Sequence, residues 1–187
     1  MRSICVFLGS NSGRHPAYAE AARSMGQELA ARNINCIYGG SDTGLMKVLA
    51  DSVLSAGGRV TGVTVQVLRE KEIFHPGLSE LHVVSSMHER KNLMAELSDG
   101  FVALPGGVGT LDEFFEIYAW TILGLHAKPF GLLDVNGYYA PLDAFLDNAE
   151  QEGFLKAKYR QMVMRAGTPA ELLERLVEGA REGARFR

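Results

Sequence analysis

The segment Phe101–Glu113, FVALPGGVGTLDE, passes from an apolar run through a glycine-rich turn into a helical pattern. Phe101–Leu104 is short and apolar, as buried strands are, and it stops at Pro105. Apolar residues then recur at helical spacing over Leu111–Leu123. The segment therefore predicts one strand–turn–helix unit of an α/β fold.

The same alternation runs along the rest of the chain. Apolar runs predict further strands at Ser3–Leu8, Asn35–Tyr38, Arg59–Val67, Leu81–Val84, Phe130–Leu133 and Met162–Arg165. Helical spacing predicts helices at Ala17–Arg32, Gly44–Ala56, Ser86–Leu97 and Pro141–Glu152, and Thr168–Glu171 opens a last helix. Nearly continuous apolar strands between helices are typical of a parallel sheet covered on both faces. We predict a single-domain, Rossmann-like α/β fold over residues 1–187.

Composition limits the partners and the compartment. The 187 residues are 47% apolar and carry a net charge of −3, so a full core is expected and a nucleic-acid partner is not. Cys5 and Cys36 lie in predicted strands without metal-binding spacing, which indicates reduced, buried thiols. No apolar run reaches the roughly 18 residues that a membrane span needs. We expect a cytoplasmic protein with no membrane contact.

Three glycine- or serine-rich turns follow predicted strands, at Gly9–Gly13, Gly39–Gly44 and Pro105–Thr110. Glycine lets the backbone approach a ligand closely, and the helix N-termini that follow bind anions. The carboxyl ends of parallel strands meet at one edge of the sheet, so the turns point to one phosphate-bearing ligand. Neither GxxxxGK[ST] nor GxGxxG occurs. Tight packing of strand against helix remains the alternative for each turn.

Thr110–Glu113 also has the T-x-x-E pattern of a capping box, in which Glu113 would only hold a backbone N–H. Glutamine caps a helix about as well as glutamate but cannot act as a base. A Glu113→Gln variant would therefore separate a structural from a chemical role.

A second polar segment, Ser86–Lys91, places Arg90 and Lys91 near the start of a predicted helix. Positive charge there opposes the helix dipole, and an anionic ligand would compensate for it. A solvated helix face is the alternative for both side chains. The histidines show no metal-binding spacing, so we predict no metal site.

The predicted helix Leu111–Leu123 is apolar on nearly all sides. Such a helix is buried on more than one face, either inside the domain or between subunits. We favour a homodimer.

The chain resembles the Lonely Guy family. Pro105–Glu113 looks like that family's PGGxGTxxE motif, and Met87–Lys91 is similar to its MHxRK motif. The likeness extends over nearly the whole chain. It implies hydrolysis of the N-glycosidic bond of a cytokinin riboside 5′-monophosphate or of AMP. Relatives have also been labelled lysine decarboxylases, but no lysine here can be assigned as the Schiff base of a pyridoxal-phosphate enzyme, so we expect no cofactor.

By this resemblance Arg90 and Glu113 form the catalytic pair, and the turn Gly106–Thr110 holds the phosphate. The predicted substrate-binding residues are Ser10, Glu72, Met87, Lys91, Gly106, Gly107, Val108, Gly109, Thr110, Leu111 and Asp112. Glu72 lies in Gln66–Glu80, the longest irregular stretch and a candidate substrate loop. The second turn departs from the family at Ser41–Asp42 and Lys47, which leaves the preferred base open. A non-catalytic carrier or sensor of a phosphate-bearing ligand is the alternative function.

Overall fold

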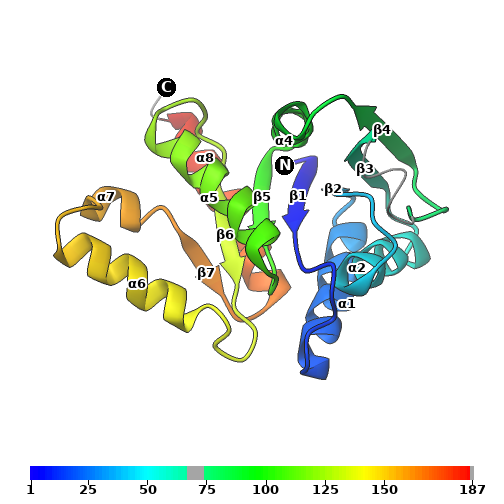
Figure 1. The fold of residues 1–187 in the computed structure, drawn as a ribbon, viewed down its shortest axis with the longest axis horizontal. Helices are drawn as coiled ribbons and strands as arrows, with labels where there is room; N and C mark the ends of the chain where they lie inside the picture. Colours follow the sequence, from blue (N-terminus) through cyan, green and yellow to red (C-terminus); the bar gives the residue numbers. More distant parts are fainter. Residues whose placement is uncertain (67–73, 186–187) are drawn as a thin grey trace.

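A computed structural model describes residues 1–66 and 74–185 of the chain. Seven parallel strands form one sheet in the order β4-β3-β2-β1-β5-β6-β7 (Figure 1). The strands are β1 (Ser3–Phe7), β2 (Asn35–Tyr38), β3 (Val60–Val65), β4 (Glu80–Val84), β5 (Gly100–Ala103), β6 (Phe130–Leu133) and β7 (Met164–Ala166). The predicted Rossmann-like α/β fold is confirmed.

Helices cover both faces of the sheet (Figure 1). One layer holds α1 (Pro16–Ala31), α2 (Gly44–Ser55) and α8 (Pro169–Arg185). The other holds α4 (Met87–Glu96), α5 (Val108–Ile122), α6 (Ala140–Gln151) and the short α7 (Ala157–Arg160). Successive strand residues point to opposite faces, and so Ile4 and Val6 join one core while Cys5 and Phe7 join the other. Burial on both faces explains why the strands are apolar without alternation.

The boundaries of several predicted elements differ from the structure. Helix α5 begins at Val108 with Gly107 as its N-cap, three residues before the predicted start. The Thr110–Glu113 capping box does not form, since Thr110 lies inside the helix and is buried. Helix α7 was not predicted, because four residues are too few to show a helical period. The third strand ends at Val65, and the last lies at Met164–Ala166.

The strand order places a switch point between β1 and β5. The chain leaves β1 toward β2 on one side, whereas β5 and its successors lie on the other. Ligands of such sheets bind beyond the carboxyl ends of the strands at this point. Within the described ranges, no helix is both long and apolar enough to cross a membrane.

Candidate active site

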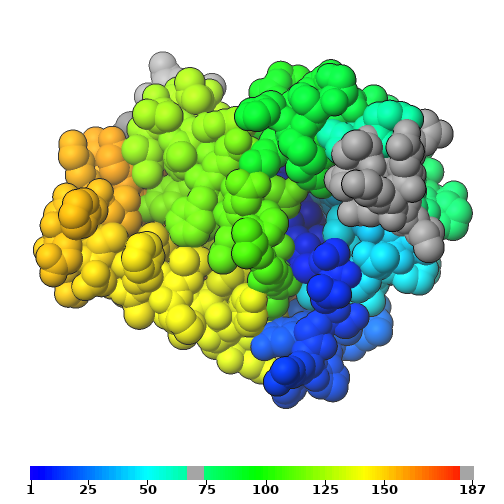
Figure 2. All heavy atoms as spheres, viewed as in Figure 1, coloured from blue at the N-terminus to red at the C-terminus, as the bar shows by residue number. Residues whose placement is uncertain are grey.

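A cleft of about 610 Å³ opens at the switch point. The loop after β1 and the turn after β5 both line it, and Figure 2 shows the blue N-terminal segment beside the green start of α5 on this face. Gly39 after β2 and side chains of α1, α2 and α4 complete the lining. The three glycine-rich turns therefore converge, as the sequence predicts.

The turn after β5 leads directly into the N-terminus of α5. Gly9 N–H donates to Pro105 O over 3.2 Å, which ties the turn to the loop after β1. No side chain caps α5 at Gly107. The first amides of a helix have no intrahelical acceptor and carry partial positive charge. This end of the cleft can accept an anion.

The glycines of this turn serve different purposes. A Cβ on Gly106 would lie 2.7 Å from Thr110 Cβ and 2.8 Å from Gly9 N, so the packing of the turn requires glycine there. A Cβ on Gly107 or Gly109 would meet nothing within 4 Å, and neither residue has a positive φ. The fold does not need glycine at these two positions, and both line the cleft. Glycine at these positions would let a ligand approach the backbone closely.

Arg90 and Glu113 meet in the cleft. Arg90 Nη1 donates to Glu113 Oε1 over 2.8 Å, and the two side chains are only 9% and 15% exposed. Arg90 Nε also donates to Val63 O over 2.9 Å, which fixes the guanidinium. Burial raises the pKa of the Glu113 carboxyl, and the positive charge of Arg90 opposes this only in part. A carboxylate of raised pKa suits proton transfer near neutral pH.

The first turn of α4 is stabilised without a ligand. Ser86 Oγ accepts from Glu89 N–H, and the Glu89 carboxylate accepts from the backbone and hydroxyl of Ser85. Arg90 pairs with Glu113, while Lys91 Nζ lies 2.7 Å from Asp112 and 3.5 Å from Glu116. Carboxylates of α5 therefore balance the positive charges of Arg90 and Lys91. The sequence had suggested that an anionic ligand does so. The solvated-face alternative is wrong for Arg90, which is 8% exposed.

Most of the predicted site residues come together. With the Arg90–Glu113 pair, the cleft is lined by Ser10, Met87, Gly106, Gly107, Val108, Gly109, Thr110 and Asp112. Lys91 and Leu111 do not line it; Leu111 lies beside Phe115 on the outer side of α5. Glu72 lies outside the described residues.

Two aromatic residues of the cleft, Tyr18 and Tyr138, were not predicted. Tyr18 belongs to the first helix after β1, and Tyr138 follows β6. Their positions after carboxyl ends of strands are the signal that could have found them. No group of three His, Cys, Asp or Glu side chains suited to a metal ion occurs among residues 1–66 and 74–185.

Together, the fold and the cleft define a Rossmann-like α/β protein whose anion-accepting turn lies beside a buried arginine–glutamate pair. Residues 46–176 match the family described as "Possible lysine decarboxylase". The chain is 48% identical over 177 residues to the probable cytokinin riboside 5′-monophosphate phosphoribohydrolase LOGL2 of Oryza sativa subsp. japonica, covering 95% of this chain and 72% of that protein. It belongs to the Lonely Guy family, as its motifs suggest.

Two further likenesses support the family and the fold. The cytokinin riboside 5′-monophosphate phosphoribohydrolase LOG5 of Arabidopsis thaliana is 45% identical over 175 residues, covering 94% of this chain and 77% of that protein. The Moco carrier protein of Chlamydomonas reinhardtii superposes with a TM-score of 0.71 at 19% identity, covering 97% of this chain and 98% of that one. At 19% identity, the likeness to the Chlamydomonas protein shows a shared fold and nothing more.

Proposed function

We propose that this protein hydrolyses the N-glycosidic bond of an adenine-type nucleoside 5′-monophosphate, releasing the free base and ribose 5-phosphate. One observation carries the proposal: a buried glutamate paired with an arginine shares a cleft with an uncapped helix N-terminus. Phosphate binding alone has no use for a carboxylate beside an anion. The names of the Oryza and Arabidopsis relatives favour a cytokinin riboside monophosphate as substrate.

The amides at the start of α5 anchor the 5′-phosphate in this mechanism. Gly107 and Gly109 leave room for phosphate oxygens to approach the backbone. An anchored phosphate holds the ribose in place and so lowers the entropic cost of reaching the transition state. A nucleoside monophosphate should therefore react much faster than the corresponding nucleoside.

Glu113 acts on the reacting carbon. Cleavage of the C1′–N bond gives the ribose oxocarbenium character, which a nearby carboxylate stabilises. Glu113 also accepts a proton from the attacking water, whose oxygen bonds to C1′. The departing base takes up a proton from solvent, and Glu113 returns its proton to solvent before the next turnover. Arg90 holds the Glu113 carboxylate in place through the 2.8 Å contact.

The purified protein should release base and ribose 5-phosphate from AMP or from isopentenyladenosine 5′-monophosphate, followed by chromatography. The ratio of the two rates identifies the preferred base. Glu113→Gln should fold and lose turnover, and Glu152→Gln, an exposed position after α6, is the matched control. An active Glu113→Gln enzyme would disprove the catalytic role.

A carrier or sensor of a phosphate-bearing ligand is the second candidate, suggested by the fold shared with the Chlamydomonas carrier. It predicts stoichiometric binding of AMP without product, equal in the wild type and in Glu113→Gln. Turnover by the wild type alone would exclude it.

We also propose a homodimer in the cytoplasm, with the outer side of α5 in the interface. Phe114 and Ile117 bury one side of this helix, but Val108, Leu123 and the nearby Leu125 are 85%, 72% and 68% exposed. Exposed apolar surface of this kind is typical of subunit interfaces. A Leu123→Lys change should shift the mass measured by light scattering from two chains to one.

The unpaired Cys5 and Cys36 suit a reducing compartment.

A further inference from the structure

The turn Leu104–Gly106 is held at three consecutive carbonyls by three different partners. The Tyr139 hydroxyl donates to Leu104 O over 2.6 Å, Gly9 N–H donates to Pro105 O over 3.2 Å, and the Tyr138 hydroxyl donates to Gly106 O over 2.5 Å. Two neighbouring tyrosines after β6 thus hold the turn after β5, more than thirty residues earlier in the chain.

The Tyr138 contact holds the peptide between Gly106 and Gly107, two residues that line the cleft. Gly106 O and Gly107 N–H belong to the same planar trans peptide and point to opposite sides of it. Fixing the carbonyl therefore fixes the direction of the N–H. Gly107 is the N-cap of α5 and lines the cleft, and its φ of −95° can change readily because glycine lacks a Cβ. Without a partner for Gly106 O, this peptide could rotate.

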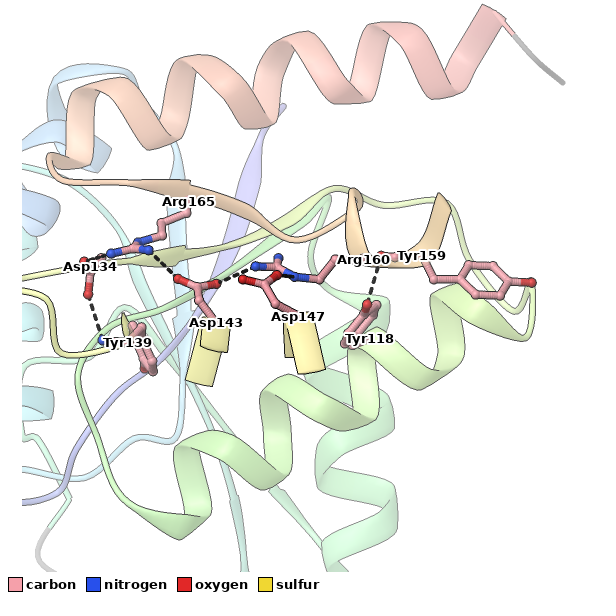
Figure 3. Close-up of polar contacts among 8 residues, drawn as sticks. All are labelled: Tyr118, Asp134, Tyr139, Asp143, Asp147, Tyr159, Arg160 and Arg165. Carbon is pink, nitrogen blue, oxygen red and sulfur yellow. Dashed lines mark hydrogen bonds and ion pairs between the residues drawn. The ribbon is translucent and has the colours of Figure 1, made fainter. Parts of the chain in front are cut away.

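A network of charged side chains holds the backbone of Tyr139, the residue next to Tyr138, in place (Figure 3). Tyr139 N–H donates to Asp134 Oδ1 over 2.7 Å, and Asp134 pairs with Arg165. Arg165 also pairs with Asp143, which accepts from Arg160 in turn. The network links the turn after β6 to α6, α7 and β7, so the tyrosines approach the glycine turn from a fixed position.

Aromatic packing orients the Tyr138 ring itself. It packs edge-to-face against Tyr18, at 5.6 Å between ring centroids, and against Tyr139 at 5.1 Å. Tyr138 is nevertheless 39% exposed, whereas Tyr139 is buried. Its hydroxyl can therefore be removed without leaving a buried polar group unpaired.

We propose that Tyr138 is a positioning residue, whose hydroxyl holds the Gly106 carbonyl and so aims the Gly107 N–H at the 5′-phosphate of the substrate. This inference rests on the proposed function, because it takes the start of α5 as the phosphate site. Tyr138 acts on the phosphate through the Gly106–Gly107 peptide and does not touch the reacting carbon.

Tyr138→Phe removes the hydroxyl and keeps the ring. A hydrogen bond of ordinary net strength corresponds to a loss of affinity of about two- to tenfold. We expect the KM for AMP to rise by about this factor, with a smaller change in kcat. The Kd for inorganic phosphate, measured by calorimetry, should rise in parallel, while the Kd for adenosine and the Tm stay unchanged.

Tyr159→Phe is the matched control, because the Tyr159 ring points away from the network and the cleft lining does not include it (Figure 3). Unchanged phosphate affinity in Tyr138→Phe would overturn the proposal, and so would an equal loss for adenosine. If the wild type hydrolyses neither AMP nor isopentenyladenosine 5′-monophosphate, the proposed function fails, but calorimetry with AMP and phosphate still tests the role of Tyr138.

Discussion

Arg90 on α4 and Glu113 on α5 form an ion pair of 2.8 Å that joins the two helices. The carboxylate has one strong counter-charge, yet burial still raises its pKa above the ordinary value of 4.5. Desolvation destabilises the charged form more than the arginine stabilises it. This balance makes Glu113 a stronger proton acceptor than an exposed glutamate.

The pH dependence of kcat/KM should reflect this raised pKa. Glu113 must be ionised to accept a proton, so activity is lost as the pH falls through its pKa in the free enzyme. The acidic limb of the profile should therefore lie above pH 4.5. Rates measured on AMP between pH 4 and 8, within the range where the protein stays folded, give its midpoint. A profile that stays flat down to pH 4.5 would contradict the assignment of Glu113 as the base.

Removing the counter-charge should raise the Glu113 pKa further. Arg90→Ala leaves the carboxylate buried without its partner, so the charged form becomes less favourable. We expect a loss of activity of about 10²- to 10⁴-fold, as for the loss of a positioned acid–base group. The acidic limb of any remaining activity should move to higher pH than in the wild type. A near-normal rate, or a limb at unchanged pH, would show that Arg90 does not support Glu113.

Gly39 allows Arg90 to reach this position. A Cβ there would collide with the Arg90 guanidinium and lie 2.7 Å from Met46 Cε. Both contacts involve side-chain ends rather than backbone, so Gly39→Ala should fold, but displacing the buried guanidinium from Glu113 and Val63 O should lower its stability. The displaced guanidinium would lose its contact with Glu113, and kcat/KM for AMP should fall at least tenfold. Gly167→Ala, where the added methyl group meets nothing within 4 Å, is the control. Full activity of Gly39→Ala would mean that the exact position of Arg90 is unimportant.

The sequence predicts the layers of this fold well, because strands buried on both faces are recognisable as short apolar runs. It fails at the start of α5, where Thr110 is the better N-cap by residue type. The fold instead packs Thr110 against Gly106, where no Cβ intervenes, and begins the helix at Gly107. Tertiary packing therefore decides this boundary.

The sequence predicts those residues of the candidate site that lie within its two motifs. The motifs contain Arg90 and Glu113, and the structure brings these two side chains together. The contact of Tyr138 with Gly106 O is different, since it depends on the reach of a side chain between neighbouring strands β5 and β6. The position of Tyr138 after a strand makes it a candidate for the cleft, but no spacing along the chain encodes its contact with Gly106 O.

A substitution at Gly109 should affect folding and ligand binding in opposite directions. It is the second residue of α5, where an added methyl group would meet nothing within 4 Å and would project into open space. Alanine is favoured over glycine in a helix by up to about 1 kcal/mol, which corresponds to a rise in Tm of about 2–4 °C for a chain of this size. Gly109→Ala should therefore stabilise the free protein.

The same methyl group should weaken binding of the substrate, because Gly109 lines the cleft beside the amides that we propose as the phosphate site. We expect a higher Tm together with a higher KM for AMP and a higher Kd for phosphate, measured by thermal unfolding, kinetics and calorimetry. A variant that is stabilised and binds phosphate normally would show that the ligand does not approach this part of the helix. A destabilised variant would mean that the fold itself requires glycine here, contrary to the open space around it. The opposite signs of the two expected effects distinguish a ligand-binding glycine from a packing glycine.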